Sequence, residues 1–111
     1  MKLLTTLLMV LVLQTKTYRV SWYGGKHHGR ITKSGVIFDK NKMTCAASSK
    51  YKIGDRLQVT NVSSNKKVIV VVNDRGGFSK YGRELDLSEG AFKKIADLKD
   101  GEVKVKIEKL N

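Results

Sequence analysis

The chain of 111 residues contains no proline and a single cysteine. Without proline, its turns must be made by glycine, asparagine, aspartate and serine. One cysteine excludes an internal disulfide, so the fold must be stabilised without one. Cys45 lies in the small apolar run 43–47, which indicates a buried side chain rather than a nucleophile.

Acidic residues are scarce: 10 Asp and Glu stand against 22 Lys and Arg, which gives a net charge of +12. Such a charge attracts anionic partners, among them nucleic acid, acidic lipid and anionic cell-wall polymers. The sequence contains no helix-turn-helix, zinc-finger or ribonucleoprotein motif, and no platform of alternating aromatic and basic residues. Nucleic acid is therefore not expected as a partner.

No apolar run in the sequence is long enough to span a bilayer, which takes about 20 residues. Residues 3–13 are apolar apart from two threonines; they follow Lys2 and end at the polar residues 14–17. This layout is typical of an export signal. Residues 1–17 are therefore predicted to be a signal peptide or an N-terminal anchor, which would be the only membrane attachment. The location is predicted as the periplasm, the cell envelope or the extracellular space.

Residues 18–111 are predicted to form one mainly β domain. Alternating apolar and polar residues predict strands in 18–23 and 102–108. Further strands are predicted at 43–48, 56–62, 67–72 and 84–88. Helical spacing occurs in 89–98, with Ser88 as the N-cap. Many short strands with one short α-helix predict a small closed barrel.

A carboxylate follows the most apolar strand. The β-branched run 68–72 predicts a strand buried on both faces, and Asn73, Asp74 and Arg75 follow at once. Gly76 and Gly77 then let the backbone turn beside the acid and leave room for a ligand. This arrangement suits a catalytic or ligand-binding acid on a rigid strand, although Asp-Arg-Gly is also common at an ordinary strand-to-turn junction. Asp74 and Arg75 are expected to point apart, because neighbours on a strand alternate.

Several motifs then occur in an order shared with one known family. They are Ser21-Trp22-Tyr23-Gly24, His28-Gly29-Arg30, Thr32, Gly35, Phe38-Asp39, Met43-Thr44, Gly54, Val59-Thr60-Asn61, Asn73-Asp74-Arg75-Gly76 and Leu85-Asp86-Leu87-Ser88. Over residues 18–110 the chain resembles the rare lipoprotein A (RlpA) family. The resemblance implies a six-stranded double-psi β-barrel, a fold also found in expansins.

The resemblance also implies an activity. Characterised members are endolytic lytic transglycosylases, which cleave the bond between N-acetylmuramic acid and N-acetylglucosamine in peptidoglycan and leave a 1,6-anhydro end. Asp74 matches the family aspartate and is the expected catalytic acid and base. The residues expected to bind substrate are Trp22, Tyr23, His28, Asn73, Arg75 and Gly76. Of Trp22 and Tyr23, one should face the core and the other the groove, and Asp86 is expected to be structural.

The chain departs from the family pattern at two polar positions. Val36 stands where the family usually has glutamate, and Ala47 or Ser48 stands where it usually has histidine. These departures keep open an alternative, a non-catalytic, expansin-like module that binds or loosens the wall. Either reading predicts a monomer that binds peptidoglycan glycan strands or another anionic wall polymer. No cofactor and no metal are expected, because adjacent His27 and His28 lack further ligands nearby.

Overall fold

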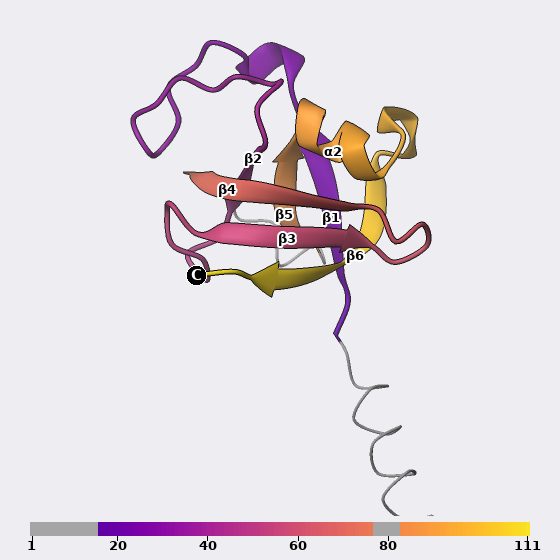
Figure 1. Ribbon diagram of the computed structural model, residues 1–111. Coiled ribbons are helices and arrows are strands. Elements are labelled where there is room, and N and C mark those ends of the chain that lie inside the picture. Colours follow the sequence, from indigo (N-terminus) through magenta and orange to yellow (C-terminus); the bar gives the residue numbers. More distant parts are fainter. Residues whose placement is uncertain (1–15, 77–82) are drawn as a thin grey trace, which may run out of the picture.

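The computed structural model describes residues 16–76 and 83–111, and the described strands form a closed barrel in the order β1-β5-β2-β4-β3-β6 (Figure 1). The strands are β1 (Tyr18–Tyr23), β2 (Thr44–Ala47), β3 (Arg56–Asn61), β4 (Lys67–Arg75), β5 (Arg83–Ser88) and β6 (Glu102–Lys109). β1 runs parallel to β5, and β2 runs parallel to β4; the other neighbours are antiparallel. The predicted mainly β fold, a small double-psi barrel with one short α-helix, is confirmed.

The barrel interior is built by alternation along each strand. In β3, Leu57 and Val59 are fully buried while Gln58 and Thr60 are only half-buried. β4 follows the same rule, since Val70 and Val72 are fully buried. The prediction that its apolar run is buried on both faces is wrong, because Ile69 and Val71 are 43% and 38% exposed. A barrel strand has one inner and one outer face, and the outer face of β4 stays open at these two residues.

The helix α2 (Glu89–Ile95) packs its apolar side onto the barrel and buries Ala91, Phe92 and Ile95. The Ser88 hydroxyl accepts a hydrogen bond from the Ala91 N–H, which confirms the predicted N-cap. The helix is shorter than predicted, because Ala96 is already extended at a φ of −159°. A separate 3₁₀ turn, η3 (Leu98–Asp100), continues the chain to β6.

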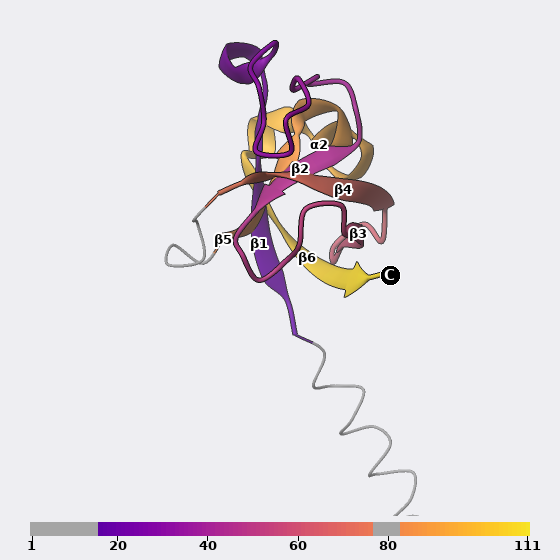
Figure 2. The same ribbon diagram turned by 90° about the vertical axis from the view of Figure 1, so that its left-hand side faces the viewer.

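A long connection between β1 and β2 stands at the same end of the barrel as α2 (Figures 1 and 2). It starts with the 3₁₀ turn η1 (Gly25–His27). Residues 29–38 then fold back on themselves into a structure that we call the arm. The Gly29 N–H donates to the Phe38 carbonyl at 3.0 Å, and Ile31 and Ile37 form an isolated bridge. The arm thus has its own backbone hydrogen bonds, although it lies outside the barrel.

The predicted export segment 1–17 lies outside the described residues apart from Lys16 and Thr17, so that assignment stays a prediction. In the part of the chain that the structure describes, no helix has the length and apolar character needed to cross a membrane.

Cys45 is fully buried in the core, as its apolar surroundings predicted. Burial raises the pKa of the Cys45 thiol to about 12, and the charge of Asp86 adds to the rise. In the unfolded chain the pKa of a thiol is about 8.5. Below about pH 8.5 the thiol is protonated in both the folded and the unfolded state, so it makes no pH-dependent contribution to stability. Above that pH the thiol ionises only in the unfolded state, which favours unfolding.

We therefore expect this thiol to lower the free energy of unfolding by on the order of 1 kcal/mol between pH 7 and pH 9.5. Urea denaturation at the two pH values checks this. A Cys45→Ala variant serves as the control, since it lacks the thiol and should show a correspondingly smaller loss. Equal losses in the two proteins would contradict the expected shift.

Candidate active site

Asp74 lies near the end of β4, opposite Ala46 of β2. A register shift between Cys45 and Ala46 interrupts the ladder at this point. The Asp74 side chain is half-buried, and its Oδ1 accepts hydrogen bonds from the backbone N–H of Arg75 at 2.9 Å and of Lys33 at 3.1 Å. Among the described residues, no hydrogen bond or ion pair reaches Oδ2. One carboxylate oxygen is therefore held in place while the other is available to a ligand.

The neighbouring Arg75 does not neutralise this carboxylate. Its Nη1 donates to the carbonyl oxygens of Ser48 at 3.0 Å and Tyr51 at 2.6 Å. The alternation along β4 thus separates the two charges, as the sequence indicated. Arg75 and Gly76 line a shallow cleft of about 360 Å³ together with Ser48 and Ser49. The structure brings Arg75 and Gly76 next to Asp74, but the guanidinium binds backbone.

The arm reaches back to β4 and contacts Asn73 and Asp74 near its end. Besides the bond from Lys33 to Asp74, the Ser34 N–H donates to the Asn73 carbonyl at 3.1 Å. The Asn73 Oδ1 is buried and has no partner among the described residues. An unsatisfied buried acceptor is uncommon in proteins, and this one belongs to the residue next to Asp74.

A second carboxylate lies in the same row of residues across the barrel. Strand pairing places Ser21, Asp86, Ala46 and Asp74 side by side on β1, β5, β2 and β4. Asp86 accepts a hydrogen bond from the Ser21 hydroxyl, and Arg83 Nη1 donates to the same hydroxyl at 3.1 Å. Asp86 is thus engaged by side chains of the barrel wall, which agrees with the structural role expected for it.

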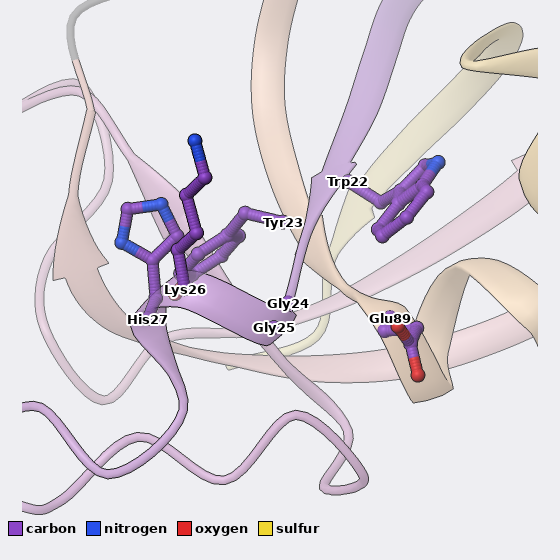
Figure 3. Close-up of a pocket in the computed structure, with 7 residues that line it drawn as sticks. All are labelled: Trp22, Tyr23, Gly24, Gly25, Lys26, His27 and Glu89. Carbon is purple, nitrogen blue, oxygen red and sulfur yellow. The ribbon is translucent and has the colours of Figure 1, made fainter.

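Trp22 and Tyr23 leave β1 on opposite sides, and the groove role expected for one of them stays a prediction (Figure 3). Trp22 packs against the core next to Phe92 and donates from Nε1 to the Leu98 carbonyl at 3.0 Å. The Tyr23 ring stacks on Phe38 of the arm, with centroids 4.5 Å apart. One face of the Tyr23 ring is therefore covered by protein.

The Tyr23 hydroxyl is buried and has no hydrogen-bond partner among the described residues. Burial raises the pKa of Tyr23, and the charges of Asp74, Cys45 and Asp86 raise it further. The phenol consequently stays protonated at all physiological pH values. The dependence on Asp74 also places Tyr23 within electrostatic reach of the candidate acid.

His28 lies in the β1–β2 connection, and the substrate-binding role expected for it stays a prediction. It is exposed beyond η1, and its Nδ1 accepts a hydrogen bond from the Lys40 N–H at 3.2 Å. No contact between His28 and Asp74 occurs within the described residues. The imidazole therefore links the two ends of the β1–β2 connection.

A cleft of about 400 Å³ opens at the end of β1, beside Tyr23. Its lining residues are Trp22, Tyr23, Gly24, Gly25, Lys26, His27 and Glu89 (Figure 3). Glu89, the first residue of α2, is the functional candidate that the sequence interpretation missed. A glutamate directly after an N-cap is a common helix-start residue, so its local pattern gave no sign of a cleft.

The two positions that depart from the RlpA pattern contribute no side-chain acid or base near Asp74. Val36 is 58% exposed on the arm, and Ala47 is fully buried beside Leu85. Ser48 contacts Arg75 through its carbonyl oxygen. Asp74 is therefore left as the candidate acid at the end of β4.

No group of three or more His, Cys, Asp or Glu side chains able to hold a metal occurs within 16–76 and 83–111. The expectation of a site without metal or cofactor stays a prediction.

A sequence profile described as lytic transglycolase matches residues 15–107. The chain belongs to the lytic transglycolase family. Endolytic peptidoglycan transglycosylase RlpA of Neisseria meningitidis is 43% identical over 96 residues, which cover 86% of this chain and 39% of that protein. RlpA of Rickettsia bellii is 45% identical over 100 residues, covering 87% of this chain and 43% of that protein. The chain thus spans about two-fifths of the length of these curated relatives.

Solved structures agree with the fold assignment. The apo expansin of Clavibacter michiganensis superposes with a TM-score of 0.67 at 25% identity, over 86% of this chain and 51% of that one. A Streptomyces papain inhibitor superposes with a TM-score of 0.63 at 20% identity, over 83% of this chain and 92% of that one. An expansin and a protease inhibitor share this barrel, so fold alone does not assign the activity.

Proposed function

We propose that this protein cleaves the glycan strands of peptidoglycan, with Asp74 as the catalytic acid and base. The observation that carries the proposal is the position of Asp74, half-buried at the end of β4 and not paired with Arg75. Its Oδ1 is held by two backbone donors, and its Oδ2 is available to a substrate. The names of the RlpA relatives support the choice of peptidoglycan.

One carboxyl group is sufficient for this chemistry. Asp74 donates its proton to the glycosidic oxygen between N-acetylmuramic acid and N-acetylglucosamine as the bond from that oxygen to C1 breaks. The muramyl 6-hydroxyl oxygen then bonds to C1, and the Asp74 carboxylate takes the hydroxyl proton. The products are a free 4-hydroxyl and a 1,6-anhydro end, and the enzyme regains its proton. Water is not consumed, so a second carboxylate to activate water is not required.

The second candidate function is a non-catalytic, expansin-like module that binds glycan. Val36 and Ala47 favour this alternative, since neither supplies an acid or base where the family usually has glutamate and histidine. Purified protein incubated with denuded glycan strands separates the two functions. Anhydro-ended fragments in the mass spectrum support catalysis, whereas retention of the protein on glycan without any fragment supports the binding module.

We further propose that the protein is exported to the periplasm, the cell envelope or the extracellular space. There it acts as a monomer on glycan strands or another anionic wall polymer. The net charge of +12 supports wall attachment. Attachment driven by this charge should weaken as salt shortens the electrostatic range to about 3 Å at 1 M. A salt titration of binding to isolated cell walls measures this contribution.

A further inference from the structure

The cleft at the end of β1 carries a carboxylate with few partners. The Glu89 side chain is 21% exposed, and its Oε2 lies 4.0 Å from Lys40 Nζ, at the limit of an ion pair. No hydrogen bond to this carboxylate occurs among the described residues. A partly buried carboxylate usually has hydrogen-bond donors. Glu89 therefore lies in the cleft wall as an acceptor that a ligand can satisfy.

Gly24 and Gly25 contribute only backbone to the lining of the cleft. A Cβ at position 24 would come within 3.0 Å of Glu89 Oε1 and 3.2 Å of Glu89 Cβ. The absence of a side chain at Gly24 thus lets the Glu89 side chain lie directly against the end of β1. Figure 3 shows Glu89 and Trp22 on one side of the glycines and Tyr23, Lys26 and His27 on the other. A ligand over the glycines would meet an acceptor on one side and a cation on the other.

The cleft adjoins the Asp74 site through Tyr23. This side chain lines the cleft, and its pKa rises partly because of the Asp74 charge. Phe38 of the arm stacks on Tyr23, and the same arm donates from the Lys33 N–H to Asp74. The cleft and the Asp74 site are therefore connected through Tyr23 and the arm.

We propose that the cleft binds one sugar unit of the glycan strand, with Glu89 accepting hydrogen bonds from its hydroxyl or acetamido hydrogens. The chemistry fits N-acetylmuramic acid, because its lactyl carboxylate complements Lys26 on the opposite side of the cleft. This inference rests on the proposed function for its choice of glycan. It assigns to Glu89 a binding role that does not include the proton transfers of Asp74.

The test measures affinity in the 111-residue chain carrying Asp74→Asn, so that substrate is not consumed. The probes are chitotetraose and the tetrasaccharide of alternating N-acetylglucosamine and N-acetylmuramic acid, titrated calorimetrically. Adding Glu89→Gln should weaken binding of both by about tenfold, the typical effect of losing a hydrogen bond to a charged group. Adding Lys26→Gln should weaken the muramyl probe alone. Glu108→Gln, which removes an exposed carboxylate on β6, is the matched control and should change neither affinity.

Unchanged affinity in Glu89→Gln for both probes would overturn the proposal. If that variant fails to fold, the protein with Glu89 intact is titrated with the same probes and followed by NMR. Absence of chemical-shift changes at the Gly24 and Gly25 amides would then overturn the proposal. The outcome is separable from that of the proposed function, which is judged by anhydro product from the wild-type protein. A protein that forms no product but loses affinity in Glu89→Gln keeps the subsite and loses the catalytic assignment.

Discussion

Replacing Asp74 by asparagine is expected to lower the rate of anhydro-sugar formation by about 10²- to 10⁴-fold, the usual contribution of a general acid or base. Asparagine has nearly the same shape, and its side-chain oxygen can still accept from the Lys33 and Arg75 N–H groups. The arm should therefore stay docked on β4. The amide, however, can neither protonate the glycosidic oxygen nor take the proton of the 6-hydroxyl. Initial rates of fragment release, quantified by mass spectrometry, check the prediction.

The control is Asp39→Asn, which changes a carboxylate in the β1–β2 connection. Asp39 Oδ1 accepts from the Asn41 N–H at 2.9 Å, a bond that an asparagine oxygen can also make. Its rate should match that of the wild type, and thermal unfolding should show both variants folded. If Asp74→Asn retains the wild-type rate, another group performs the chemistry. Asp86 is then the first to test, since it lies in the same row across the barrel.

The strands of the barrel were predictable because one inner and one outer face give each strand a period of two. Residues 18–23 and 102–108 alternate clearly, and β1 and β6 occupy nearly the same ranges. The same logic failed for 68–72, where apolar residues also occupy the outer positions Ile69 and Val71. Composition alone could not distinguish a fully buried strand from a barrel strand with an apolar outer face.

The site was predictable only where local rules decide it. The Arg75 guanidinium points away from Asp74, and this could be predicted because neighbouring residues on a strand point to opposite sides. The docking of Lys33 on Asp74 joins residues 41 positions apart, through the path of the arm. Likewise, Gly24 and Glu89 meet only because the end of β1 faces the start of α2. Contacts of this kind depend on tertiary structure, so the sequence pattern did not indicate the cleft.

Replacing Gly90 by alanine is expected to destabilise the fold by about 1–3 kcal/mol, the usual cost of overpacking. A Cβ at this position would lie 2.8 Å from the carbonyl oxygen and 3.0 Å from the carbonyl carbon of Asn41. Both are backbone atoms, and the Gly90 N–H also donates to the neighbouring Lys40 carbonyl at 2.8 Å. The contact can be relieved only by moving the β1–β2 connection away from α2. Urea denaturation of the two proteins measures the difference in free energy of unfolding.

The matched control is Gly24→Ala, which adds the same methyl group near a side chain instead of backbone. Its nearest contacts are Glu89 Oε1 at 3.0 Å and Glu89 Cβ at 3.2 Å, which belong to a side chain and not to the backbone. Its loss in free energy of unfolding should therefore be smaller. Gly90→Ala is expected to be less stable than the wild type even though alanine is favoured over glycine within a helix by roughly 1 kcal/mol. A Gly90→Ala protein as stable as the wild type would show that the connection can shift freely on α2. The arm belongs to this same connection, which the bond from Lys40 to His28 ties together. In that case, the packing of the connection against α2 would have no part in holding the arm on Asp74.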